Sequence, residues 1–134
     1  MWPFSRAAKE NPRLTIDGIE VVFNLEHEYW QFTYRETEFW SSGPAFQLPS
    51  KADLDAILAT VESLWLEIQT RVKDGLRENG EVESTDDESY SVNIQDFAAQ
   101  RTFEVSWSVG EPCPEFGVDF TIRDGKIVDE QWGD

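Results

Sequence analysis

The sequence predicts an α+β fold, in which an antiparallel sheet of about six strands is covered on one face by a single long helix. Two Asp-Gly dipeptides lie between apolar runs, one stretch of the C-terminal part alternates between apolar and polar residues, and one helical stripe fills the middle. We expect three or four strands, then the helix, then four strands. They form a single domain over residues 14–134, after a flexible basic tail at 1–13.

The first hairpin is predicted around Asp17-Gly18. A two-residue type I′ turn needs positive φ at both central positions, and Asp-Gly meets this need. In that register Ile16 faces Ile19 and Leu14 faces Val21. All four side chains then share one face, which is the consistency that a real hairpin requires.

A third strand is expected over residues 28–35, followed by an interrupted segment over 39–48. The interruption is Gly43-Pro44 with the two serines before it, which is typical of a loop. We therefore expect a short strand, a loop and a brief extended stretch before the helix.

The clearest element is a helix that begins after Ser50 and ends at Asn79-Gly80. Ser50 is the expected N-cap, with Asp53 as the acidic partner of a capping box three residues later. From Leu54 to Leu76 apolar residues recur at helical spacing, which predicts one continuous apolar stripe.

After an acidic segment at 81–89, which we expect to be a solvated linker, strands are predicted at 90–94 and 102–109. A last hairpin is expected around Asp124-Gly125. A plain two-residue loop there puts Phe120 opposite Asp129. Either a β-bulge intervenes, or Asp129 lies at the rim of the core face.

The charge is strongly negative, with 27 acidic against 11 basic residues and a formal net charge of −16. This disfavours nucleic acid and anionic membranes as partners, and it steers association toward basic proteins, metal cations or cationic ligands. Solubility alone also explains such a charge. The single cysteine, Cys113, leaves no intramolecular disulfide, and no segment resembles a signal peptide or a membrane span, so we expect a cytoplasmic monomer or homodimer.

No catalytic motif is present, which favours a non-enzymatic role. His27 is the only histidine and has no companion ligand or nucleophile at a defined spacing. Cys113 lies between two prolines among acidic residues, whereas a reactive thiolate needs positive surroundings. The acidic run at Asp86, Asp87 and Glu88 lacks the spacing of a calcium loop, so we predict no metal site and no cofactor.

Two sets of residues leave a second possibility open. Asp119, Asp129 and Glu130 of the last hairpin can converge with Glu104 across the sheet, as acid–base hydrolysis requires of carboxyl groups. Aromatic residues either line a cavity or form the core: Trp30, Tyr34, Trp65 and Trp107.

The segment from Phe120 to Val128 resembles the terminal hairpin of small-ligand proteins with the nuclear-transport-factor-2-like cone fold. Proteins of that family open with helices that build the cone, whereas here the helix follows the first strands. No Asp–His pair matches the polyketide cyclases of that family.

The first functional hypothesis is a non-enzymatic, acidic interaction protein that binds a basic protein, as an immunity protein or an inhibitor of a cationic toxin does. The alternative is a small-ligand-binding domain or hydrolase with a Trp-lined pocket and carboxylates from the last hairpin. The residues expected to bind the partner are Glu81, Glu83, Asp86, Asp87, Glu88, Asp129, Glu130, Trp132 and Trp40.

Overall fold

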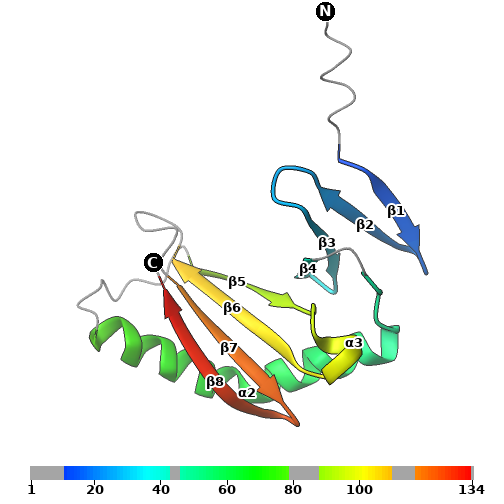
Figure 1. Ribbon diagram of the computed structural model, residues 1–134. Coiled ribbons are helices and arrows are strands. Elements are labelled where there is room, and N and C mark those ends of the chain that lie inside the picture. Colours follow the sequence, from blue (N-terminus) through cyan, green and yellow to red (C-terminus); the bar gives the residue numbers. More distant parts are fainter. Residues whose placement is uncertain (1–10, 43–45, 79–87, 110–116, 134) are drawn as a thin grey trace, which may run out of the picture.

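The computed structural model describes residues 11–42, 46–78, 88–109 and 117–133, and Figure 1 shows their arrangement. The elements are β1 (Arg13–Ile16), β2 (Ile19–Asn24), β3 (Tyr29–Tyr34), β4 (Thr37–Ser42), α2 (Lys51–Glu78), β5 (Glu88–Asn93), α3 (Phe97–Gln100), β6 (Phe103–Val109), β7 (Gly117–Arg123) and β8 (Lys126–Gly133). The fold is α+β, as the sequence predicts.

The sheet has eight strands in sequence order, so the expectation of about six is too low. It is also mixed, because β4 and β5 pair in parallel while all other neighbours are antiparallel. The parallel pair results from the connection through α2, since a helical crossover returns the chain in its original direction. The join is short and consists of the pairs Phe39–Val92 and Trp40–Asn93.

The fourth strand is longer than expected because a tight turn starts it early. Arg35 and Glu36 connect β3 to β4 with φ values of 49° and 65°, which is a left-handed conformation that residues other than glycine seldom adopt. Arg35 is held in place by an ion pair with Asp55 of α2 at 3.0 Å. A contact far away in the sequence thus stabilises a turn that carries no Asn-Gly or Asp-Gly signal.

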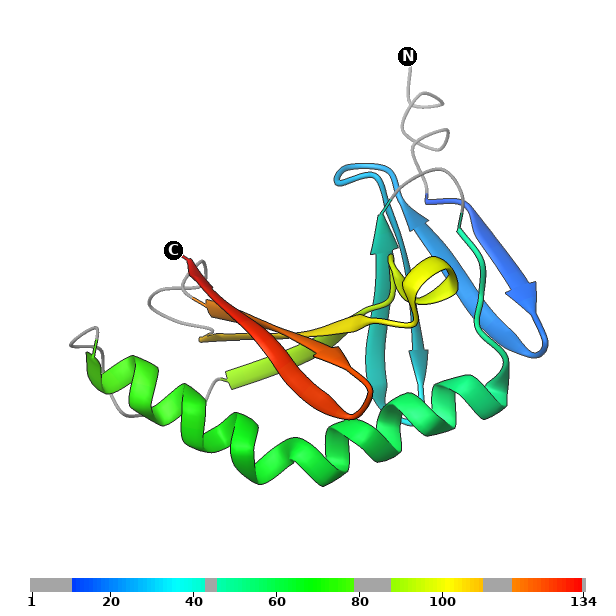
Figure 2. The same cartoon turned by 60° about the horizontal axis from the view of Figure 1, so that its bottom comes forward.

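The sheet consists of two four-stranded halves, and α2 passes under both (Figures 1 and 2). In Figure 2, β1–β4 run across the direction of β5–β8, and the second half of α2 lies along one face of β5–β8. Buried residues from the helix and from both halves of the sheet form a single core cluster.

The predicted helix and first hairpin are confirmed. The Asp53 amide donates a hydrogen bond to Ser50 Oγ at 3.1 Å, which is the expected cap, and the helix ends at Glu78. In the hairpin Leu14 pairs with Val21 and Ile16 with Ile19. The buried residues of the helix stripe are Leu54, Ile57, Val61, Ile68, Val72 and Leu76.

The last hairpin contains a β-bulge, which is one of the two alternatives expected. Ile122 pairs with Ile127, but the register shifts so that Phe120 lies opposite Glu130 and Asp129 opposite Thr121. Because side chains alternate along a strand, the extra residue turns Asp129 to the opposite side of the sheet from the buried Phe120.

Candidate functional site

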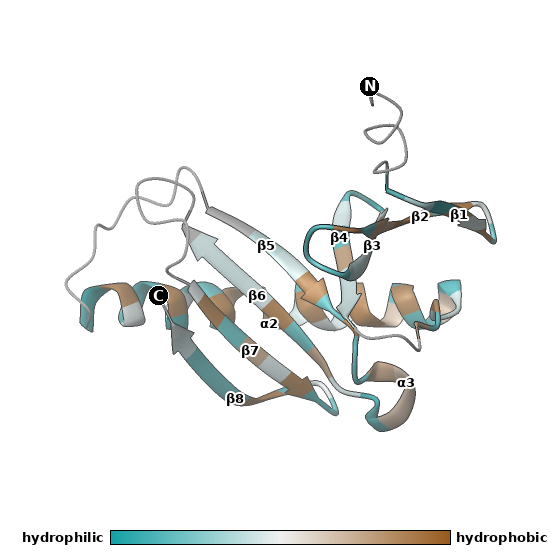
Figure 3. Cartoon of the chain, turned by 45° about the horizontal axis from the view of Figure 1, so that its top comes forward, coloured by the Kyte–Doolittle hydropathy of each residue, from teal (hydrophilic) through white to brown (hydrophobic). Residues whose placement is uncertain are grey.

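The side of β5–β8 that faces away from α2, here called the outer face, is polar throughout. Strand alternation turns the apolar side chains of these strands toward the helix and leaves the others outside. Figure 3 shows hydrophobic and hydrophilic residues alternating along β7, whereas β8 is hydrophilic over most of its length. The registered residues of the outer face are Ser91, Asn93, Glu104, Ser106, Asp119, Thr121, Asp129 and Gln131.

A hollow of about 450 Å³ opens on the outer face. Its lining includes Ser91, Ser106, Asp119 and Gln131, and β4 contributes Glu38. Among the described residues that line it there is no lysine or arginine. The hollow therefore offers two carboxylates together with hydroxyl and amide groups, which is a set of hydrogen-bond acceptors suited to a cation.

Glu104 is the carboxylate of the outer face that is most affected by its surroundings. Burial raises its pKa above the ordinary 4.5, and the negative charge of Asp119 raises it further. Asn93 Nδ2 donates a hydrogen bond to Glu104 Oε1 at 3.2 Å, and a hydrogen bond with Thr121 also favours the ionised form. Glu104 is thus a half-buried charge beside another charge of the same sign, which an incoming cation would relieve.

The arginines that form ion pairs lie elsewhere. Arg13 pairs with Glu20, Arg35 with Asp55, Arg71 with Glu67 and Glu130, Arg77 with Asp74, and Arg101 with Asp53. Within the described ranges no ion pair involves the outer-face acids, which are Glu38, Glu104, Asp119 and Asp129. In β7 and β8 the basic residues are confined to the hairpin tip, at Arg123 and Lys126.

Aromatic side chains border the outer face on its β4 side. The indole nitrogen of Trp40 donates a hydrogen bond to Ser91 Oγ at 3.1 Å, which ties β4 to β5 beside the hollow. The Trp40 ring lies 5.8 Å from that of Tyr29, and the Tyr29 ring lies 6.2 Å from that of His27. Half-buried aromatic residues beside a polar patch are typical of protein interfaces.

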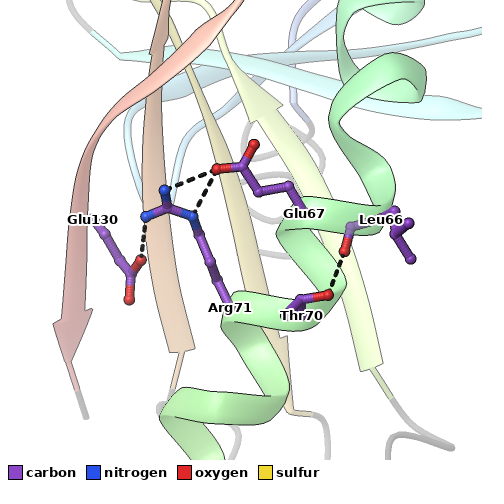
Figure 4. Close-up of polar contacts among 5 residues, drawn as sticks. All are labelled: Leu66, Glu67, Thr70, Arg71 and Glu130. Carbon is purple, nitrogen blue, oxygen red and sulfur yellow. Dashed lines mark hydrogen bonds and ion pairs between the residues drawn. The ribbon is translucent and has the colours of Figure 1, made fainter.

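Among the residues predicted to bind a partner, Asp129 and Trp40 lie on the same side of the sheet as the hollow. Glu130 and Trp132 lie on the opposite side, where both are half-buried against α2. Figure 4 shows Arg71 reaching from the helix to Glu130, whose other oxygen accepts a hydrogen bond from the Trp132 indole at 2.6 Å.

Glu88 is the first residue of β5, while Glu81, Glu83, Asp86 and Asp87 lie outside the described residues, as does Cys113.

The carboxylates expected to converge do so only in part. Glu104, Asp119 and Asp129 share the outer face, whereas Glu130 is held on the helix side. Glu38 and Ser91 were not predicted from the sequence. Glu38 reaches the hollow through the parallel join of β4 to β5, and Ser91 through the pairing of β5 with β6, where it lies opposite Ser106. Asp119 and Ser106 could be predicted more easily, since both occupy polar positions of strands in which apolar and polar residues alternate.

A second hollow, of about 510 Å³, lies on the helix side. It is lined by Trp65 of α2 and Tyr90 of β5, with the β3–β4 turn on its other side. Trp30 stacks on Phe46 at 5.3 Å and lines neither hollow. Trp107 is 3% exposed, although it is among the residues that line the hollow of the outer face. Trp65 is the tryptophan that lines the hollow on the helix side.

In the described part of the chain, no helix has the length and apolarity needed to cross a membrane. Nor do three or more His, Cys, Asp or Glu side chains of the described residues come together in a way that could hold a metal ion. No protein-family model matches the sequence, and searches of curated proteins and of solved structures find no match.

Proposed function

We propose that the chain is a non-enzymatic interaction protein that binds a basic protein through the outer face of β5–β8. The partner presents lysine or arginine side chains to the hollow lined by Glu38 and Asp119. An immunity protein or an inhibitor of a cationic toxin or nuclease works in this way. A reducing cytoplasm suits a chain with one cysteine.

The observation that supports this proposal most is the gathering of four acids on the outer face, none of which belongs to a described ion pair. The described ion pairs involve α2, β1, β2, the chain flanking β3 and β6, and the helix side of β8, and none includes an outer-face acid. Acids that only confer solubility need no particular face. Four acids gathered on one side, with no basic residue among the described residues that line the hollow, form the complement of a basic surface.

The test is the rate of association with basic proteins captured from the native cytosol, measured at low and at high salt. A steered charged interface should lose association rate by on the order of tenfold at high salt, because mobile ions screen the attraction. Recovery of no basic protein at low salt would contradict the proposal.

Variants locate the interface. We expect the double change Glu38→Gln and Asp119→Asn to slow association severalfold. A matched control removes the same charge from the helix side, by Glu62→Gln and Glu78→Gln, two exposed residues of α2 outside the described ion pairs. Equal losses in both double variants would mean that only the overall charge matters and that the outer face is not the binding surface.

A further inference from the structure

The hollow on the helix side lies where three elements meet: the turn between β3 and β4, the first half of α2, and β5. It opens on the helix side, since α2 lines it, and Tyr90 is the residue that it shares with the hollow of the outer face. Its volume of about 510 Å³ is within the usual range of small-molecule sites, which is roughly 300–1,000 Å³.

Two aromatic rings form one corner of this hollow. The rings of Trp65 and Tyr90 have centroids 4.9 Å apart and planes inclined by 49°. Both side chains are half-buried, so part of each ring stays accessible. Val61 and Leu58, one and two turns earlier on α2 than Trp65, add apolar surface. An open aromatic corner of this kind attracts cations, because the face of each ring is electron-rich.

Two carboxylates also line the hollow, and one of them is already engaged. Asp55 accepts hydrogen bonds from the Tyr34 hydroxyl at 2.8 Å and from Arg35 at 3.0 Å. The Tyr34 hydrogen bond, followed by that of Arg35, lowers the pKa of Asp55, so Asp55 is ionised at neutral pH and holds Arg35. Glu62 also lines the hollow and has no ion pair with any described residue. Two carboxylates therefore face a single guanidinium.

Thr37 adds a polar group to the wall. The residue is 8% exposed, and its hydroxyl has no hydrogen-bond partner within the described ranges. No fully buried side-chain oxygen or nitrogen of the described residues lacks a partner, so this hydroxyl is open to the hollow that Thr37 lines. It is available to hydrogen-bond a polar group of a ligand.

We propose that this hollow binds a small organic cation, in which an ammonium or guanidinium group is joined to a flat apolar group. The apolar group packs on Leu58 and Val61, the cation lies against the rings of Trp65 and Tyr90, and Glu62 balances its charge. An anion is disfavoured, because Arg35 is already neutralised by Asp55. This inference does not rest on the proposed protein partner, since Trp65 and Glu62 line only the hollow on the helix side, although Tyr90 lines both hollows.

The test uses phenethylammonium as the probe, with phenethyl alcohol and hydrocinnamate as neutral and anionic compounds of the same shape. Binding is followed through the indole N–H signals of the intact chain in NMR spectra, with the Trp65 signal assigned from the Trp65→Phe variant. The ammonium should bind about tenfold more tightly than the alcohol. It should shift the Trp65 signal and leave the Trp40 signal of the outer face unchanged.

Two variants at exposed positions of α2 test whether binding occurs in this hollow. Glu62→Gln should weaken phenethylammonium severalfold, while Glu78→Gln, the same change farther along the helix, should not. Ala59→Phe places a ring in the hollow and should abolish the Trp65 shift, and the Trp65 signal of the free variant shows that it is folded. The proposal is overturned if phenethylammonium leaves Trp65 unshifted, if the alcohol binds as tightly, or if the filled variant still binds.

Discussion

The two faces of β5–β8 differ in how their acidic side chains are paired, and two adjacent residues of β8 show the difference. Glu130 faces α2 and is satisfied twice, by Arg71 at 3.0 Å and by the Trp132 indole at 2.6 Å. Asp129 faces outward and accepts one hydrogen bond, from the Gln131 amide at 3.1 Å. An acid that serves the fold is paired within the fold, because a buried charge without a partner is costly. The outer-face acids belong to no ion pair among the described residues, which is why we propose that they bind a partner.

Changes at two adjacent residues of β7 should show this contrast most strongly. Phe120 is 0% exposed on the helix side, and Phe120→Ala should cost about 3–5 kcal/mol in the free energy of unfolding, because it removes buried apolar surface and leaves a cavity. Asp119→Ala on the outer face should change stability by less than about 0.5 kcal/mol. Urea unfolding measures both.

The effects of the two variants on the rate of association with the basic partner should be in the reverse order of their effects on stability. Asp119→Ala should slow association, whereas Phe120→Ala, measured where it remains folded, should not. A large loss of stability in Asp119→Ala would contradict the division between the two faces, because it would show that the outer-face acid supports the fold.

A second prediction concerns how closely α2 approaches β8. Gly75 is buried in the helix, and a Cβ atom at this position would collide with the Trp132 indole. Gly75→Ala should therefore destabilise the fold by about 1–3 kcal/mol, although alanine is the better helix former. Trp132→Leu in the same chain should remove most of that penalty.

The native chain, the two single variants and the double variant form a double-mutant cycle, which thermal or urea unfolding measures. If Gly75→Ala costs as much in the Trp132→Leu background as in the native chain, the close approach of helix and strand is not the cause of the loss.

Local patterns were enough to predict the elements that depend on them. The stripe from Leu54 to Leu76 fixes the helix, and the Asp17-Gly18 turn fixes the register of the first hairpin. The β3–β4 turn depends instead on Arg35 and on its contact with Asp55, so no turn motif marks it. Helix α3 could not be predicted from a local pattern either, because it depends on distant contacts. Arg101 follows the helix, stacks over Phe97 at 4.2 Å and pairs with Asp53 of α2.

The candidate site was less predictable, since it depends on which strands become neighbours. The polar positions of β6 and β7 could be read from alternation, and they include Ser106 and Asp119. The parallel join that brings Glu38 beside Ser91 depends on the path of α2, which no local pattern specifies. Trp132 was expected to be exposed to a partner because it lies near the end of a predicted strand. Its packing on Gly75 can be predicted only when the position of the helix is known.

The smallest change in stability is expected at Glu104, which lies on the outer face but is half-buried. Its folded pKa lies above the ordinary 4.5, so the folded state binds the proton more tightly than the unfolded state does. The contribution of Glu104 to stability is therefore fully present below that ordinary pKa and is lost as the pH rises through the folded pKa. Glu104→Gln should stabilise the fold at neutral pH, by less than about 1 kcal/mol, because it removes a half-buried charge beside Asp119.

Urea unfolding across the acidic range distinguishes this effect from a simple change in packing. The advantage of Glu104→Gln should disappear as the pH falls and the native Glu104 becomes protonated, while Asp129→Asn, an exposed change on the same face, should show no such trend. The same Glu104→Gln variant should associate more slowly with the basic partner. If Glu104→Gln raises the free energy of unfolding and slows association, Glu104 serves the interaction at the expense of stability. If the stabilisation does not depend on pH, the charge of Glu104 is not what destabilises the native fold.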